Sequence, residues 1–332
     1  MKIAIVGCAH IHVPSFVKQL RERVGELPVA AVWDRDPARA AKYAAELGAP
    51  VVPDAETIWR DASVEAVVIA SETCFHRELV IAAAKSGKHM FVEKPLGFTA
   101  ADAQAAADAA EASGKIFQTG YFMRGQSTHL FLKQKLAEGA FGTVTRVRHS
   151  NCHSGLYKGW FDADYRWMAD PAVAGCGAFG DLGTHSLDIL MWLFGKPQSV
   201  FAAVRTLDGR YGQACDEYGE GMLFYPDGMI ATIAAGWLDP HNPVTCEICG
   251  TRGHAAVIGG KVYFQSALVP GSDIAEPVAD LPEMLPHAFT LYLDALMGKT
   301  VPLVGVREAA DRNLVMEALY RAAAEGRTVA ID

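Results

Sequence analysis

The 332-residue chain has few cysteines, no excess of positive charge and no long hydrophobic run. Seven scattered cysteines are too few for a disulfide-stabilised secreted domain, and they indicate free thiols in a reducing compartment. A net charge of -8 gives no field that would attract nucleic acid or an anionic membrane. No apolar run approaches a membrane span, and the chain start carries no secretory signal. We therefore expect a cytoplasmic protein that binds neither nucleic acid nor a membrane.

Metal-ligating patterns are also scarce. Cys246 and Cys249 have CxxC spacing, but they fall in an expected strand, where residues three apart point to opposite faces. No second pair accompanies them, as a zinc site would require. One further set is conceivable but lacks a recognised ligand spacing: His153, Cys176, Asp181 and His185. The sequence therefore predicts no metal site.

Half of the residues are hydrophobic, and a chain of this length exceeds the usual size of a single core. In the first part, short apolar runs alternate with helical stretches that open or close on Pro37, Gly48 and Thr99. The expected strands are 2–6, 29–33, 66–70, 89–92 and 116–120, and the expected helices include 37–47, 75–85 and 99–112. This alternation predicts a doubly wound parallel sheet over 1–121. The motifs at its strand ends decide whether this is a Rossmann dinucleotide-binding domain.

The first expected strand ends in Gly7-Cys8-Ala9-His10-Ile11-His12, here called the glycine loop. Glycine permits a tight turn, the backbone can then pass close to a pyrophosphate, and the next helix offers free amide hydrogens. Ala9 and His12 stand where the G-x-G-x-x-G pattern has glycines, so the loop alone would fit an ordinary strand-to-helix turn equally well.

Asp34 ends the second expected strand. A carboxylate there can accept hydrogen bonds from both adenosine ribose hydroxyls and repel a 2′-phosphate, which favours NAD. Arg35 follows directly, and its guanidinium could receive that phosphate. The sequence therefore predicts NAD as the preferred cofactor and leaves NADP possible.

Glu93-Lys94-Pro95, here called the tripeptide, follows the buried strand 89–92 at the sheet edge where α/β folds place reacting groups. Taken alone it would also fit a charged loop tip. An ammonium beside an oxidised nicotinamide can have its pKa lowered and can relay or polarise the proton of an alcohol. We expect Lys94 to do this, and Glu93 to meet the nicotinamide ribose.

A second candidate group lies in the stretch 175–188. If a helix begins near Gly180, Asp181 and His185 share one face four residues apart. A histidine can take the hydroxyl proton of an alcohol while a carboxylate orients the histidine or the substrate. The same spacing would also fit a helix-start aspartate and an unrelated core histidine. We assign Lys94 and His185 jointly to acid/base work, without deciding which acts first.

The second part of the chain, 122–332, reads as strands with fewer helices. The expected strands are 143–150, 199–207, 220–224, 229–235, 244–249, 255–258 and 261–265, and the helices 285–297 and 307–326 close the chain. We expect an α+β substrate-binding and oligomerisation domain built on a largely antiparallel open sheet. If the first strand ran further, His149 and His153 would share a face, which makes His153 a substrate candidate.

Together these motifs resemble the Gfo/Idh/MocA oxidoreductases over essentially the whole chain. The segments that carry the resemblance are Gly7 to His12, Val32 to Pro37, Val67 to Ser71 with His76, Gly87 to Leu96, Gly120-Tyr121 and Gly175 to Asp188. The resemblance implies that one face of the second sheet covers the cofactor. It implies that the other face is available for pairing in a homodimer or homotetramer.

The loop chemistry and the resemblance together predict the site residues. For the cofactor they are Gly7, Ala9, His10, Ile11, Asp34, Arg35, Ser71, His76, Glu93, Lys94, Tyr121 and Trp167. For the substrate they are His153, Arg166, Asp181 and His185, and the catalytic set is Lys94, His185 and Asp181.

The expected activity is hydride transfer between NAD(P) and a secondary alcohol or carbonyl of a sugar, cyclitol or related polyol. Two alternatives remain. One is an NAD-dependent glycosidase or lyase that uses transient oxidation and elimination, which would retain NAD without net NADH. The other is a non-catalytic nucleotide-dependent sensor on the same fold.

Overall fold

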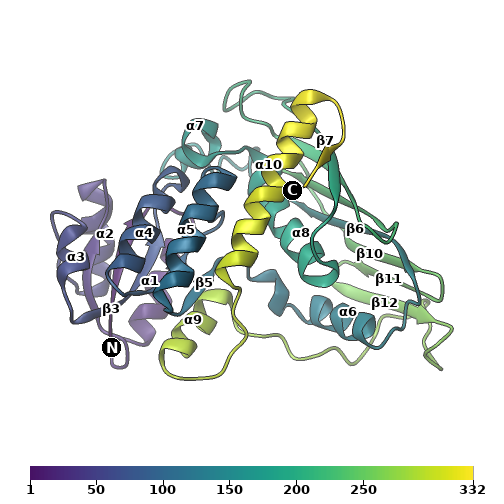
Figure 1. The fold of residues 1–332 in the computed structure, drawn as a ribbon, viewed down its shortest axis with the longest axis horizontal. Coiled ribbons are helices and arrows are strands. Elements are labelled where there is room, and N and C mark those ends of the chain that lie inside the picture. Colours follow the sequence, from purple (N-terminus) through teal and green to yellow (C-terminus); the bar gives the residue numbers. More distant parts are fainter. Residues whose placement is uncertain (332) are drawn as a thin grey trace. The chain divides into compact units, whose positions relative to one another are not determined.

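The computed structural model describes residues 1–331, which form two compact units (Figure 1). Unit 1 comprises Met1–Tyr121, Phe161–Gly175 and His287–Asn313. Unit 2 comprises Phe122–Trp160, Cys176–Pro286 and the chain from Leu314 onward. The first change of unit falls where the sequence predicts a domain boundary. Two segments expected in the second domain, 161–175 and 287–313, belong instead to unit 1.

Unit 1 contains a five-stranded sheet in the order β2-β1-β3-β4-β5, with every pair parallel. Its strands are β1 (Lys2–Cys8), β2 (Val29–Trp33), β3 (Val64–Ala70), β4 (His89–Val92) and β5 (Phe117–Thr119). β1 and β3 are almost wholly buried, because helices cover a parallel sheet on both faces. The expected doubly wound sheet is confirmed.

Local sequence accounts for several helix ends in unit 1. Its α-helices are α1 (Val13–Glu22), α2 (Pro37–Leu47), α3 (Glu56–Arg60), α4 (His76–Lys85), α5 (Ala100–Ser113), α7 (Pro171–Ala174), α9 (Ala288–Leu296) and the start of α10 (Val306–Glu325), with 3-10 turns η1 (Thr73–Phe75) and η3 (Arg166–Ala169). The Asp36 carboxylate accepts hydrogen bonds from two amides in the first turn of α2. Gly48 ends that helix in the left-handed conformation at φ 62°.

Aromatic packing explains why the segment 287–313 belongs to unit 1. The Phe289 ring of α9 lies 4.3 Å from the ring of Phe16 in α1 and 5.0 Å from that of Phe91 in β4. The buried Tyr292 donates its hydroxyl to the carbonyl of Val67 in β3. Burial of these side chains against the parallel sheet favours this placement. No local sequence pattern predicts it.

Unit 2 contains an eight-stranded sheet in the order β12-β11-β10-β6-β9-β8-β7-β13. Its strands are β6 (Val144–Cys152), β7 (Ser199–Arg205), β8 (Tyr218–Phe224), β9 (Ile230–Gly236), β10 (Val244–Gly250), β11 (Gly253–Ile258), β12 (Lys261–Ser266) and β13 (Val329–Ala330). All pairs are antiparallel except β6 with β9. The expected largely antiparallel sheet is therefore confirmed.

The helix α8 (Ala178–Phe194) packs on one face of this sheet, and α6 (Ser127–Ala137) also belongs to unit 2. Gly183 of α8 faces Ile233 and Ala235 of β9, and a Cβ at this position would lie 3.5 Å from the Cβ of Ala235. On β8 and β9, Tyr218, Met222 and Ile230 are exposed. Pairing of a second subunit on this sheet stays a prediction.

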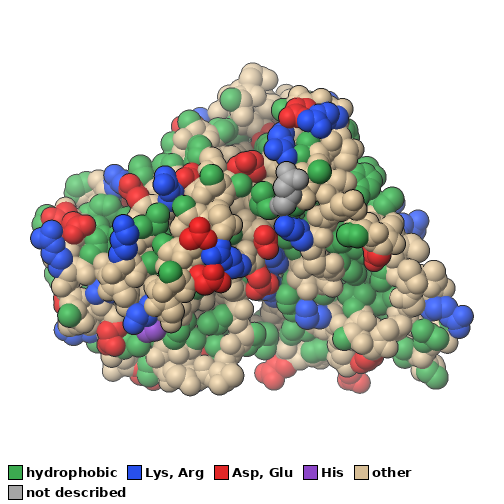
Figure 2. All heavy atoms as spheres, viewed as in Figure 1, with side chains coloured by type: hydrophobic (Ala, Val, Ile, Leu, Met, Phe, Trp, Pro, Cys, Tyr) green, Lys and Arg blue, Asp and Glu red, His purple; other side chains and the backbone are tan. Residues whose placement is uncertain are grey.

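No helix in the described part of the chain has the length and apolar character needed to cross a membrane. On the surface shown in Figure 2, lysine and arginine side chains are interspersed with aspartate and glutamate. This mixture agrees with the net charge of -8.

Candidate functional site

The glycine loop forms a tight turn at the carboxyl end of β1. Gly7 has φ 86°, and a Cβ there would lie 2.5 Å from the Cβ of Ser71 beyond β3. The amides of Ala9 and His10 both donate to the carbonyl of Ala70, and α1 begins at Val13. The loop thus combines a glycine-dependent close approach with a helix amino terminus, as a pyrophosphate cradle requires.

Asp34 lies at the end of β2, and its carboxylate is surrounded by donors. It accepts hydrogen bonds from the backbone amides of Cys8 and Asp36. Arg39 donates to both of its oxygens, with Nε to Oδ2 at 2.9 Å and Nη2 to Oδ1 at 2.7 Å. Glu72 accepts a further bond from Arg39 at 2.7 Å. Burial opposes the charge on Arg39, but these two carboxylates raise its pKa.

The two arginines near Asp34, Arg35 and Arg39, have different partners. The sequence pattern singled out Arg35, whereas Arg39 is the arginine that pairs with Asp34. Arg35 lies over the Phe75 ring, 3.7 Å from its centre, and pairs with Glu78. Arg39, which the sequence analysis did not single out, is the arginine on Asp34. It lies in the first turn of α2, five residues after Asp34, so helix geometry rather than adjacency returns its side chain to the strand end.

A hollow of about 260 Å³ adjoins the glycine loop. Its lining includes Cys8, Ala9, Arg39, Lys42, Tyr43 and Tyr165. These residues could hold the adenosine end of a dinucleotide.

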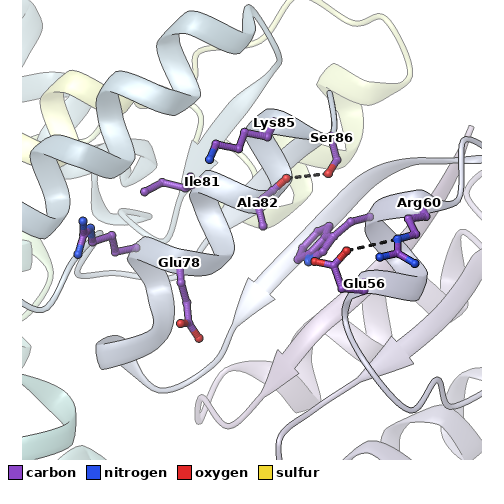
Figure 3. Close-up of a pocket in the computed structure, with 9 residues that line it drawn as sticks. Glu56, Arg60, Glu78, Ile81, Ala82, Lys85 and Ser86 are labelled. Carbon is purple, nitrogen blue, oxygen red and sulfur yellow. Dashed lines mark hydrogen bonds and ion pairs between the residues drawn. The ribbon is translucent and has the colours of Figure 1, made fainter.

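A larger hollow in unit 1, of about 550 Å³, lies between α3 and α4 (Figure 3). Glu56 and Arg60 form an ion pair in α3 on one side, and Lys85 and Ser86 lie on the other. None of the predicted site residues lines this groove. Size alone therefore does not identify the candidate site.

The tripeptide lies at the end of β4, and it contacts the glycine loop. Oε1 of Glu93 lies 3.0 Å from Nδ1 of His12, and the backbone amide of Lys94 donates to Oε2 at 3.0 Å. Glu93 is fully buried, and Lys94 is only 4% exposed. Two motifs 81 residues apart in sequence therefore meet at one edge of the sheet.

Glu93 is held as a carboxylate. Burial by itself would raise its pKa, but the neighbouring His10, His12 and Lys94 hold the pKa of this carboxyl well below its usual range. The tripeptide thus brings a buried negative charge to the glycine loop.

Ser71 directly follows β3, and His76 is the first residue of α4. The ring of His76 is fully buried, with Nδ1 2.8 Å from the carbonyl oxygen of Pro95 and Nε2 3.2 Å from that of Ser71. Burial lowers the pKa of His76, and a neutral imidazole donates to only one of the two carbonyls. His76 therefore links the segments after β3 and β4, and its role toward a cofactor stays a prediction.

Trp167, from the inserted segment 161–175, reaches the glycine loop. Its Nε1 donates to the carbonyl of Ala9 at 3.0 Å, and its ring lies 6.2 Å from that of His10. Arg166 beside it donates to the carbonyl of Ala169. Tyr121 is buried in the unit 1 core. These placements put Trp167 beside the loop, while contact of any of the three with a ligand stays a prediction.

Asp181 and His185 lie on α8 in unit 2, as the helical spacing predicts. Oδ2 of Asp181 accepts a hydrogen bond from Nε1 of Trp237 at 3.1 Å. His185 is 4% exposed, and its ring packs edge-on against that of Phe122 at 5.3 Å. Lys94 belongs to unit 1 and His185 to unit 2, so their joint action stays a prediction.

The amino terminus of α8 is held by a buried carboxylate that the sequence analysis did not find. Asp216 accepts hydrogen bonds from the amides of Gly177 and Phe179 and from the hydroxyl of Tyr320. The same hydroxyl accepts from the amide of Gly180 at 2.8 Å. Burial raises the pKa of Asp216 although these donors oppose the shift. Asp216 and Tyr320 thereby fix the first turn of the helix that carries Asp181 and His185.

Two buried histidines support the same helix. Nδ1 of His129 must donate to the carbonyl of Met123 at 2.9 Å, which leaves its Nε2 to accept from Nε2 of His149 at 3.2 Å. Nδ1 of His149 then accepts from the hydroxyl of Ser186 at 2.9 Å. Burial lowers the pKa of both histidines, which therefore form a neutral, ordered chain.

The shared-face expectation for His153 required a strand that reaches this residue, whereas β6 ends at Cys152. Beyond the strand, Nδ1 of His153 accepts from the amide of Gly155, and its ring lies 4.6 Å from that of Trp160. Substrate contact by His153 stays a prediction.

A parallel doubly wound sheet with a glycine loop and a carboxylate at the second strand end defines unit 1 as a Rossmann-type dinucleotide-binding unit. Residues 1–121 match the oxidoreductase family with an NAD-binding Rossmann fold, and residues 129–256 match the GFO/IDH/MocA C-terminal domain. The chain belongs to the Gfo/Idh/MocA oxidoreductase family, which confirms the expected resemblance.

The named relatives are dehydrogenases and reductases, which confirms the expected enzyme class. The 1,5-anhydro-D-fructose reductase of Ensifer adhaerens is 26% identical over 264 residues, covering 79% of this chain and 76% of the relative. The D-xylose 1-dehydrogenase (NADP(+)) 2 of Haloferax volcanii is 31% identical over 246 residues, covering 73% of this chain and 71% of the relative. The levoglucosan dehydrogenase of Pseudarthrobacter phenanthrenivorans is 31% identical over 259 residues, covering 68% of this chain and 64% of the relative.

A solved levoglucosan dehydrogenase in complex with NADH and levoglucosan shares the fold. Its TM-score is 0.82 at 20% sequence identity, covering all of this chain and 99% of that one. These relatives therefore include one named for NADP(+) and one solved with NADH.

Proposed function

We propose that this protein transfers hydride between NAD and a secondary alcohol or carbonyl of a sugar, cyclitol or related polyol, with Lys94 and His185 as acid/base groups. The observation that carries the proposal is the contact between His12 and Glu93, which joins the glycine loop to the tripeptide at one sheet edge. A nicotinamide bound through that loop would lie near the buried Lys94. The substrate class rests on relatives named for anhydrofructose, levoglucosan and xylose.

The unit 1 residues fit a dinucleotide. The Gly7 turn has no room for a side chain, and the loop through Ala9, His10 and Ile11 leads into the amino terminus of α1, which suits the pyrophosphate. When bound, the cofactor supplies the hydride acceptor or donor at the nicotinamide ring. Ser71, His76, Tyr121 and Trp167 are assigned to the same ligand on family resemblance.

The adenosine end is assigned to Asp34 and the hollow beside it. Asp34 favours NAD because a carboxylate accepts hydrogen bonds from ribose hydroxyls. Arg39 and Lys42 line the same hollow, so a 2′-phosphate would meet two cationic groups as well as Asp34. We infer that NAD is preferred and that NADP is accepted.

Proton transfer is assigned to Lys94 and His185, with Asp181 orienting the substrate or the imidazole. Both Lys94 and His185 are shielded from bulk water, which makes a proton exchanged with the substrate less available to solvent. Trp237 fixes Asp181 through its indole N–H. Arg166 and His153 are further substrate contacts in this proposal.

The test is a panel of polyols, inositols, aldoses and phosphorylated sugars with NAD and with NADP, following the absorbance of reduced cofactor. We expect turnover with at least one polyol, and its loss in Lys94→Ala and His185→Asn. The exposed Lys85 on α4 offers a matched control, because Lys85→Ala removes a lysine far from the sheet edge. Turnover that Lys94→Ala leaves unchanged would overturn the proposal.

The same panel separates the elimination chemistry. If glycosides are cleaved while NAD stays bound and no NADH accumulates, the glycosidase or lyase replaces the dehydrogenase. If the cofactor binds and no substrate turns over, the non-catalytic sensor replaces the dehydrogenase as the proposed function.

A further inference from the structure

Two histidines of the glycine loop and the buried glutamate of the tripeptide converge in unit 1. The ligand atoms of His10, His12 and Glu93 all lie within 4.8 Å of one another. Oε1 of Glu93 lies 3.0 Å from Nδ1 of His12 and 3.7 Å from Nδ1 of His10. The first distance is that of a hydrogen bond, and the second is too long for one.

Both distances fit a different arrangement, in which three atoms surround one cation. Zinc binds imidazole nitrogen and carboxylate oxygen at roughly 2.0–2.2 Å in a tetrahedral geometry, so two of its ligand atoms lie about 3.4 Å apart. The two separations lie on either side of that value. We propose that His10, His12 and Glu93 bind a first-row divalent transition-metal ion of the Zn²⁺ type.

The carboxylate is oriented for this role. Its Oε2 accepts the backbone amide of Lys94, so Oε1 is the oxygen presented to the histidines. Gly120 leaves the space that this orientation needs, because a Cβ at that position would lie 2.4 Å from Oε2. One oxygen is thus fixed by the backbone while the other faces the two imidazoles, as outer contacts do in metal sites.

The histidines offer suitable nitrogens. Nδ1 of His10 accepts a long, 3.3 Å hydrogen bond from the backbone amide of His12, and Nδ1 of His12 donates to the Glu93 carboxylate at 3.0 Å. A bound cation would replace the first hydrogen bond and displace the proton of the second, so that each nitrogen would offer its lone pair to the metal. The His12 side chain is 32% exposed whereas Glu93 is fully buried, so the site has an entry path on one side.

The donor set limits the ion. Two imidazoles with one carboxylate are typical of zinc and non-haem iron sites, whereas calcium and magnesium prefer oxygen ligands. Three protein ligands leave at least one coordination position for water or for an oxygen of a bound molecule. The proposed hydride transfer needs no such ion, so this site goes beyond the proposed function.

A second group of potential ligands converges in unit 2, formed by Glu247, Cys249 and His254. Arg146 and Arg148 both approach the carboxylate of Glu247, at 3.7 Å and 3.5 Å. All three residues of this second group are only partly buried, whereas His10 and Glu93 of the unit 1 group are buried. The unit 1 group is therefore the stronger candidate.

The experiment uses the full chain carrying Cys249→Ser, which disables the second group. The protein is stripped with a chelator, kept free of nucleotide and titrated with Co²⁺, whose visible absorption reports ligation. We expect one Co²⁺ per chain, displaced by Zn²⁺, and a higher unfolding temperature with either metal. Because the readout is metal binding, its failure leaves the hydride-transfer proposal untouched.

The variants His10→Gln and His12→Gln should each weaken Co²⁺ binding by about ten- to a hundredfold or more, as loss of a group at a metal site does. His241→Gln, at an exposed histidine of unit 2, is the matched control and should bind like the parent. Circular dichroism checks the fold, and either loop variant suffices if the other fails to fold. Absence of a Co²⁺ band in the parent, or a band unchanged in a folded loop variant, would overturn the site.

Discussion

The carboxyl edge of the unit 1 sheet and the α8 region of unit 2 hold their candidate groups by different means. At the sheet edge, each group follows directly on a parallel strand, and the common direction of the strands brings the groups together. On α8, Asp181 and His185 depend on contacts from distant segments, through Trp237, Asp216 and Tyr320. Backbone topology places the first set, whereas long-range side-chain hydrogen bonds place the second.

The largest expected effect comes from removing both proton-transfer candidates. Lys94→Ala and His185→Asn should each lower kcat by about 10²- to 10⁴-fold, since each removes a group of a single acid/base step. If they act as one relay, the double variant should be hardly worse than the poorer single variant. If the fall in kcat of the double variant equals the product of the two single falls, the two residues act independently. Steady-state kinetics on a polyol substrate measures this.

The next effect concerns how α8 is held. Asp216→Ala removes the acceptor of two helix-start amides and should lower the free energy of unfolding by about 2 kcal/mol, with a lower kcat from displacement of Asp181 and His185. Tyr320→Phe keeps the ring and should cost about 1 kcal/mol. Urea unfolding with kinetics on the same samples checks both. Wild-type stability and kcat in Asp216→Ala would refute the anchoring role.

Acid should weaken unit 2 through its histidine chain. Burial lowers the pKa of His129 and His149, so below the ordinary value near 6.5 the unfolded chain binds more protons than the folded one. The free energy of unfolding should therefore fall as pH drops below about 6.5, by up to about 1.4 kcal/mol per pH unit for each histidine. Urea unfolding between pH 7.5 and pH 5 measures the slope, which should be shallower in His149→Gln. Identical slopes would contradict the assignment.

The smallest expected effect separates the two arginines near Asp34. Arg39→Ala should increase the preference for NAD over NADP about tenfold, because it removes a cation from the candidate adenosine hollow and leaves Asp34 to repel a 2′-phosphate. Arg35→Ala is the matched control and should change the ratio little, since Arg35 contacts Phe75 and Glu78. The ratio of kcat/KM for the two cofactors is the measurement. A larger change in Arg35→Ala would reverse the assignment.

Much of unit 1 could be predicted because its signals are local. Continuous apolar runs mark strands buried on both faces, and Asp36 with Pro37 and Gly48 marks both ends of α2. The position of Lys94 at the end of β4 follows from the same pattern. The sequence also predicted the strands of unit 2 apart from the short β13, whose two residues are too few to show the alternation of a strand.

The missed features depend on contacts between distant residues. Arg39 reaches Asp34 through the turn of a helix, and Asp216 reaches α8 from a loop almost 40 residues away. β6 ends at Cys152, one residue before His153, so the strand that the shared-face expectation required does not reach that far. None of these contacts has a fixed sequence spacing.

The sequence by itself determined the family, the parallel sheet and the identity of the chemical groups, since periodicity, turn residues and short motifs act over a few positions. Only the tertiary structure decided which segments complete each unit, which arginine meets Asp34 and that His10, His12 and Glu93 converge. Those outcomes arise from burial and hydrogen bonding between distant segments, and the free energy of such contacts depends on the whole packed core.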